Sequence, residues 1–173
     1  MNYQTLRHLG VAALLILLQV TIFNKVHLFG YATPMLYIYI LIKTPVQWSR
    51  WSILLIAFVV GLILDIFSNT MGLHTASLVA AAMTLPFWVR LLLRQYEELG
   101  DITPSMTHPK PSAFMRYALA IILLHHTLLF CLEYFTITHW LPLLLETSTS
   151  AMLTLGLVIL IDSLLSSQPQ ETR

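Results

Sequence analysis

Long apolar runs recur along this chain of 173 residues, and their lengths constrain its fold more than any other feature. A helix that crosses a bilayer needs roughly 20 mostly apolar residues, within a range of about 17 to 25. Five segments meet that requirement once flanking aromatic and small polar residues are counted: residues 9–23, 51–67, 72–89, 113–131 and 147–165. The chain is therefore predicted to be an all-α, polytopic membrane protein that forms a helical bundle.

Composition agrees with that class. Hydrophobic residues make up 57% of the chain and charged residues only 10%, whereas soluble domains average about 25% charged residues. We interpret residues 1–173 as a single integral membrane domain. The net charge of +1 gives no sign of nucleic-acid binding, and the only cysteine, Cys131, leaves no intrachain disulfide and no cysteine metal site.

A sixth apolar segment, residues 28–42, is shorter and contains Pro34 near its start. Proline is tolerated in the first turn of a helix and less well further in. Two arrangements stay open: six transmembrane helices, or five helices plus one re-entrant segment. We favour six, because aromatic residues that resemble interfacial anchors occur toward both ends of the segment: Tyr31, Tyr37, Tyr39, Trp48 and Trp51.

The positive-inside rule orients these segments. With six crossings and a cytoplasmic N-terminus, Lys25 faces outward and the other basic residues face the cytoplasm: Arg7, Lys43, Arg50, Arg90, Arg94, Lys110, Arg116 and Arg173. The C-terminus and the loop of residues 94–113 are then cytoplasmic. A re-entrant sixth segment would move only Arg7, so charge does not choose between the arrangements. On the outer side, the apolar run 140–145 is too short to cross and is expected at the interface.

A carboxylate interrupts one of the most apolar stretches, GLILDIFSNTMGLHT at residues 61–75. Asp65 follows Gly61 by four residues, so the two share one helical face. Gly72 opens the next apolar run. The motif predicts a tight helix–turn–helix hairpin with a carboxylate at its tip and a bare backbone patch beneath it.

Several roles stay open for Asp65. An ionisable residue in a membrane helix is a functional candidate by default, which favours a contact with a partner or a lock between the two helices. The carboxylate could instead reach headgroup water, or cap the first amides of the next helix. Asn69 or Thr70 is expected to be the N-cap residue of that helix.

The fifth predicted span and the region after it carry several potential metal ligands: His125, His126, Glu133, His139 and Glu146. A zinc site needs three or four converging ligands, and no such spacing requires one here. We expect no metal, two histidines satisfied by neighbouring helices, and a structural His74. Asp162 and Glu146, at opposite ends of the last span, are expected to reach water.

No motif for catalysis is present. The chain lacks a nucleophile elbow and a phosphate-binding loop. A transporter would be expected to carry polar groups near the bilayer midplane and a repeated half. The midplane residues here are mostly Leu, Ile, Val and Ala. We therefore expect neither an enzyme nor a cofactor.

Two motifs together indicate a family. Pro34 lies within ATPMLYIYILI, and GLILDIFSNTMGLHTAS contains Gly61, Asp65 and Gly72 in the spacing G-x-x-x-D with a following G. Over nearly its full length the chain resembles the rod shape-determining protein MreD family. The stretch LLHHTLLFCLEYF is similar to one branch of that family. Met35 departs from the pattern, since many members have an acidic residue after the proline.

The resemblance implies a non-catalytic scaffold of the bacterial cell-elongation complex, which directs lateral peptidoglycan synthesis at the inner membrane. Its closest partner would be an MreC-like bitopic protein. An MreB filament, a RodA-type glycosyltransferase and a class-B penicillin-binding transpeptidase would be indirect partners. Pro34, Gly61, Asp65 and Gly72 would then form a partner-binding site or a structural hairpin.

The alternative comes from another class, the substrate-binding subunit of an energy-coupling-factor vitamin transporter. Those subunits are similar in size and span number, and the MreD fold resembles theirs. They commonly carry an AxxxA pattern in the first helix for docking to the energising partner. Ala12 and Ala13 occur in the first span here without that pattern, and the outer loops have few polar groups for a ligand.

Overall fold

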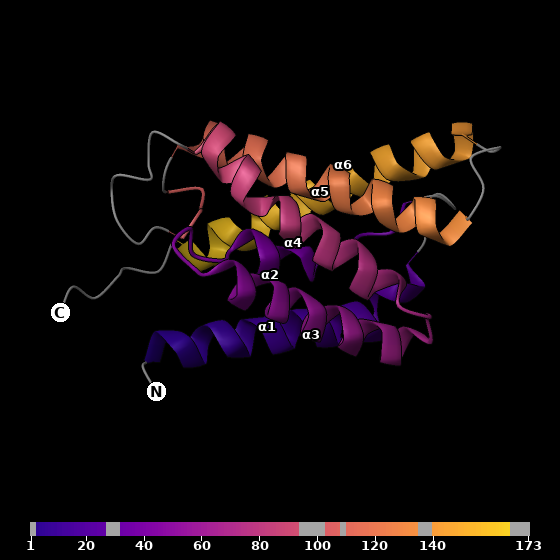
Figure 1. Ribbon diagram of the computed structural model, residues 1–173, viewed down its shortest axis with the longest axis horizontal. Coiled ribbons are helices and arrows are strands. Elements are labelled where there is room, and N and C mark those ends of the chain that lie inside the picture. Colours follow the sequence, from indigo (N-terminus) through magenta and orange to yellow (C-terminus); the bar gives the residue numbers. More distant parts are fainter. Residues whose placement is uncertain (1–2, 27–31, 94–102, 108–109, 135–139, 167–173) are drawn as a thin grey trace.

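The computed structural model describes residues 3–26, 32–93, 103–107, 110–134 and 140–166 (Figure 1). These residues form helices without any β-strand: α1 (Tyr3–Thr21), the 3-10 turn η1 (Phe23–Lys25), α2 (Ile38–Ile42), α3 (Arg50–Ser68), α4 (Leu73–Leu92), α5 (Pro111–Tyr134) and α6 (Trp140–Ser166). The predicted all-α fold class is confirmed.

Five of these helices, α1 and α3 to α6, are long and apolar enough to cross a membrane. The 19 residues of α3, at about 1.5 Å per residue, span about 28 Å, close to the roughly 30 Å hydrocarbon core of a bilayer. The protein is therefore a multi-pass membrane protein.

The helices α3 to α6 alternate in direction along the bundle, and α1 runs in the same direction as α3 (Figure 1). At one end, Arg7 of α1 donates a hydrogen bond of 2.8 Å to the carbonyl of Leu165 in α6. At the other end, Asn24 donates a hydrogen bond of 2.6 Å to Ser68, the last residue of α3. We call the end that holds Arg7 and Leu165 the basic end, and the end that holds Asn24 and Ser68 the hairpin end.

Since α1 and α3 both run from the basic end to the hairpin end, the chain must return between them. Residues 32–43, here called the broken crossing, make this return beside α6 (Figure 1). The N–H of Thr33 donates to Ser150 Oγ at 2.9 Å, and Lys43 Nζ lies 2.9 Å from an oxygen of Asp162. Ser150 and Asp162 are about 18 Å apart along a straight helix, and α2 is the only helical part of the crossing.

Side chains from α1 and α6 satisfy the non-helical backbone of the broken crossing. The N–H of Met35 donates to Thr154 Oγ1 at 3.1 Å, and the N–H of Leu36 donates to Gln19 Oε1 at 2.7 Å. Gln19 also donates to the carbonyl of Pro34 at 3.1 Å. Non-helical backbone at membrane depth is tolerated only where protein buries it, and residues 34–39 are buried.

The sixth segment thus refines the two predicted arrangements. The chain passes between the ends of the bundle once more, as the six-span arrangement requires, but the described part of the segment, residues 32–42, is not a transmembrane helix. Helix α2 has five residues, about 7.5 Å of rise. The segment is also not re-entrant, because it joins opposite ends. Pro34 has no N–H for a helical hydrogen bond, and neighbouring side chains replace the missing bonds.

Two predicted boundaries are wrong. The run 140–145 is not a separate interfacial segment, because it forms the first turns of α6, which extends over 27 residues. The predicted loop 94–113 ends earlier, because α5 begins at Pro111, a residue favoured in the first turn of a helix. Residues 94–102 and 108–109, and with them Arg94, lie outside the described residues, as do Tyr31, His139 and Arg173.

Candidate functional site

The hairpin between α3 and α4 depends on two residues with positive φ. Asn69 ends α3 with φ of 55°, and its N–H donates to the carbonyl of Asp65. Gly72 precedes α4 with φ of 84°. Asparagine is among the side chains that tolerate the left-handed region, and glycine adopts it freely. The chain therefore reverses within a few residues at this position.

The carboxylate of Asp65 accepts four hydrogen bonds, one from the turn of the hairpin and three from the first turn of α4. Thr70 Oγ1 at 2.5 Å and the N–H of His74 at 3.0 Å donate to Oδ1. The N–H of Thr75 at 2.9 Å and its Oγ1 at 2.6 Å donate to Oδ2. Asp65 is 4% exposed. An anion that binds the free amides of a helix N-terminus stabilises that helix, so Asp65 caps α4 from within α3.

Gly61 brings the two helices into backbone contact one turn below Asp65. A Cβ atom at position 61 would lie 2.5 Å from Thr75 Cα and 2.9 Å from its nitrogen. Carbon atoms in contact are normally separated by about 3.5–4.0 Å. The absence of a side chain at Gly61 therefore allows Thr75 to approach closely enough for both of its donors to reach Asp65.

The structure brings Gly61, Asp65 and Gly72 together in one hairpin and places Pro34 elsewhere, beside Gln19 in the broken crossing. The sequence left several roles open for Asp65. The hydrogen bonds correspond to two of them: Asp65 caps α4 and links it to α3. The predicted N-cap was wrong: Gly72 takes that position, and Asn69 belongs to the end of α3. Asp65 supplies the side-chain acceptor that a glycine N-cap lacks.

A buried polar cluster lies next to this hairpin. The hydroxyl of Tyr37 is 2.9 Å from His74 Nδ1 and 3.2 Å from His125 Nε2. Ser77 Oγ lies 3.3 Å from the same His125 nitrogen. The hydrogen bond from the His74 N–H to Asp65 connects the cluster to the hairpin. The sequence did not predict this cluster, because its members come from α4, α5 and the broken crossing.

The neighbouring His126 has partners at both ring nitrogens. Nδ1 is 2.8 Å from the carbonyl of Ile122, and Nε2 is 3.2 Å from Thr154 Oγ1. Within the described residues, no group of three or more His, Cys, Asp or Glu side chains is arranged to hold a metal ion. Glu133 is exposed at the end of α5.

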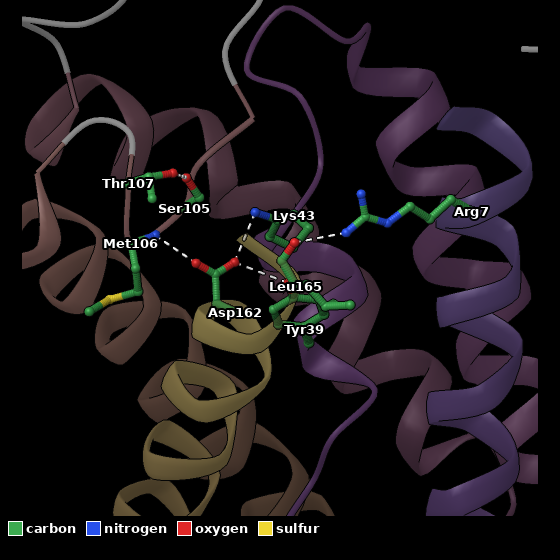
Figure 2. A network of polar contacts seen from close by, with 8 residues as sticks. All are labelled: Arg7, Tyr39, Lys43, Ser105, Met106, Thr107, Asp162 and Leu165. Atoms are coloured by element: carbon green, nitrogen blue, oxygen red, sulfur yellow. Dashed lines mark hydrogen bonds and ion pairs between the residues drawn. The ribbon is translucent and has the colours of Figure 1, made fainter. Parts of the chain in front are cut away.

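A second buried carboxylate, Asp162, joins three segments at the basic end (Figure 2). Tyr39 Oη at 3.0 Å and Lys43 Nζ at 2.9 Å donate to Oδ1. The N–H of Met106 donates to Oδ2 at 2.6 Å. The expectation that Asp162 reaches water was wrong, because the broken crossing and residues 103–107 cover it. Glu146, at the other end of α6, is partly exposed.

Lys43 follows α2 at the basic end, outside the spanning helices. Its side chain is 16% exposed, and Asp162 supplies both its hydrogen bond and its opposite charge. A buried lysine that retains a carboxylate partner is a structural contact between distant segments. The sequence offered one signal for this pair: Lys43 and Asp162 are both predicted to lie near the cytoplasmic end of the bundle.

These contacts define a class of protein, an all-helical membrane bundle in which two buried carboxylates of the described residues, Asp65 and Asp162, hold segments together. Each Asp65 oxygen accepts two hydrogen bonds from within the hairpin, so the geometry favours a lock over a proton-transfer group. No protein-family model, no curated protein and no solved structure matches the chain.

Proposed function

We propose that this protein is a non-catalytic membrane scaffold of the bacterial cell-elongation complex, located in the inner membrane with its C-terminus in the cytoplasm. It would bind an MreC-like bitopic protein and help to organise the RodA-type glycosyltransferase and the class-B transpeptidase beside the MreB filament. The proposal rests on the resemblance to the MreD family over nearly the full length of the chain.

The observation that supports it most directly is the internal use of Asp65. A carboxylate that carried out catalysis or bound a solute would need to face a substrate, whereas this one is buried and accepts hydrogen bonds from α4. The motif that carries the resemblance thus stabilises a rigid corner. A rigid corner is what a scaffold needs in order to present a defined surface.

Apolar side chains next to this corner are exposed and could form the contact with a partner. Ile66 and Phe67 lie in the last turn of α3, and Met71 lies in the turn of the hairpin. Lipid is as apolar as these side chains, so a partner helix would gain from close packing and not from hydrophobicity itself. We therefore assign partner contact to these three residues and a supporting role to Asp65.

Crosslinked affinity purification of the tagged protein from native membranes tests the proposal. We expect recovery of an MreC-like protein together with the two wall-synthesis enzymes. Phe67→Ser with Met71→Ser should reduce that recovery while the protein stays folded, and Met152→Ser, exposed on α6, is the matched control. Wild-type purification that yields none of these partners would contradict the proposal.

The broken crossing favours the vitamin-transporter subunit as a second candidate. Discontinuous segments that bury polar side chains are typical of substrate sites in transporters. The same purification separates the two candidates, since a transporter subunit would co-purify with ATP-binding-cassette ATPases and a coupling membrane protein. Asp65→Asn is a separate test of the Asp65 charge. Normal cell shape and normal retention of the MreC-like protein in this variant would exclude a role for that charge in partner binding.

A further inference from the structure

A pocket of about 170 Å³ lies at the basic end, where the connection before α3 meets α3 and the last turns of α4. Its lining combines two arginines, one tryptophan and five aliphatic or proline side chains: Arg50, Arg90, Trp48, Val46, Ile53, Leu85, Pro86 and Val89. Drug-sized ligands generally occupy about 300–1,000 Å³. This pocket is therefore large enough for a small charged group only.

The two arginines have no protein partner in the part of the chain that the structure describes. Two other basic side chains of this end have partners: Lys43 pairs with Asp162, and Arg7 donates to the Leu165 carbonyl. Arg50 and Arg90 are exposed and line the same pocket. Among its described lining residues this pocket has two positive charges and no carboxylate, a combination that favours the binding of an anion.

The position of the pocket indicates what kind of anion it would bind. Arg50 and Arg90 lie in the first turn of α3 and the last turn of α4, where spanning helices emerge from the hydrocarbon core. Trp48 is half-exposed beside them, as expected for a side chain at the headgroup level. Ile53, Leu85 and Val89 continue the lining toward the core. The pocket is thus charged at the membrane surface and apolar toward the core, as a lipid headgroup and its acyl chain are.

We propose that this pocket binds the phosphate of an anionic phospholipid from the leaflet at the basic end. The guanidinium groups of Arg50 and Arg90 would hold the phosphate oxygens, for which the planar donor geometry of arginine is well suited. Basic pockets between membrane helices recognise lipid headgroups by this chemistry. The lipid site does not depend on the proposed scaffold function, because it requires only a membrane whose leaflet at the basic end contains anionic phospholipid.

Native mass spectrometry of the full chain in detergent tests this lipid site. Phosphatidylglycerol should bind, and phosphatidylcholine with the same acyl chains should bind more weakly, because its headgroup has no net charge. Arg50→Gln with Arg90→Gln should weaken phosphatidylglycerol binding about 30-fold, the loss expected for two basic residues near a headgroup. Arg116→Gln, an exposed residue of α5, should leave binding within about twofold.

Further variants keep the result interpretable if the double glutamine variant is poorly folded. Arg50→Lys with Arg90→Lys retains both charges, so it should keep part of the affinity and an unchanged melting temperature. Equal binding of the two lipids, or an equal loss in Arg116→Gln, would overturn the proposal. Displacement of phosphatidylglycerol by millimolar inorganic phosphate would assign the pocket to free phosphate and would also overturn it.

Discussion

Asp65 and Asp162 are both buried carboxylates, but their hydrogen-bond donors lie at very different distances along the sequence. The donors to Asp65 lie within ten residues of it, all in the hairpin that follows. The side-chain and backbone donors to Asp162 come from Tyr39, Lys43 and Met106, at separations of 123, 119 and 56 residues. One carboxylate closes a local turn, and the other joins segments that are distant in sequence.

This difference has a consequence for folding. Local contacts form with little loop-closure entropy, so the α3–α4 hairpin can assemble as a unit. The contacts of Asp162 require that α6, the broken crossing and residues 103–107 are already in place. We therefore expect changes at Asp65 to loosen one hairpin, and changes at Asp162 to destabilise the whole bundle.

The largest effect is expected for Asp162→Ala, which leaves the partly buried Lys43 ammonium and Met106 N–H without their acceptor. Breaking a buried ion pair in this way costs about 3–5 kcal/mol. The free energy of unfolding in detergent, measured by denaturant titration, checks this value. Leu160→Ala, exposed on the same helix, is the control, and an equally small effect in both variants would contradict the network.

Asp65→Ala should destabilise the protein by about 2–3 kcal/mol, because an N-terminal cap and charge-assisted hydrogen bonds are lost together. Asp65→Asn keeps an acceptor and should cost about half as much. Amide hydrogen exchange distinguishes this site from Asp162. Exchange should accelerate at His74 and Thr75 and stay unchanged at Met106, whereas acceleration at both ends would mean that the hairpin is not an independent unit.

Gly61→Ala should destabilise by about 1–3 kcal/mol, because its methyl group would overlap Thr75 and push α3 away from α4. Gly156→Ala is a matched control, since a Cβ there would meet no atom within 4 Å. That control should stabilise α6 by about 0.5–1 kcal/mol, the difference in helix propensity. Similar effects of the two substitutions on the melting temperature would refute the close approach at Gly61.

The smallest effect is expected for Gly72→Ala. A Cβ at this position has free space but a φ of 84°, so only backbone strain opposes it. We expect a loss of about 1 kcal/mol in the free energy of unfolding. Gly10→Ala in α1, also without a neighbour within 4 Å, should not be destabilising, and a destabilised Gly10→Ala would show that strain at position 72 is not the cause.

The sequence by itself determined the class of this protein and the hairpin. Apolar runs long enough to cross a bilayer must form helices, since lipid offers no hydrogen bonds to the backbone. The spacing of Gly61, Asp65 and Gly72 predicted the turn because all of its contacts lie within one short segment. Even there, the identity of the N-cap residue was missed, because the acceptor comes from the preceding helix.

Only the tertiary structure decided the form of the broken crossing and the burial of Asp162. The apolar sequence around Pro34 is compatible with a helix, and it is held open by Gln19, Ser150 and Thr154 from other helices. In the same way, Asp162 at the end of an apolar helix could reach water until distant segments cover it. Partners on different segments, here 15 to 123 residues apart, leave no periodic pattern in the sequence, so their pairing depends on how the helices pack.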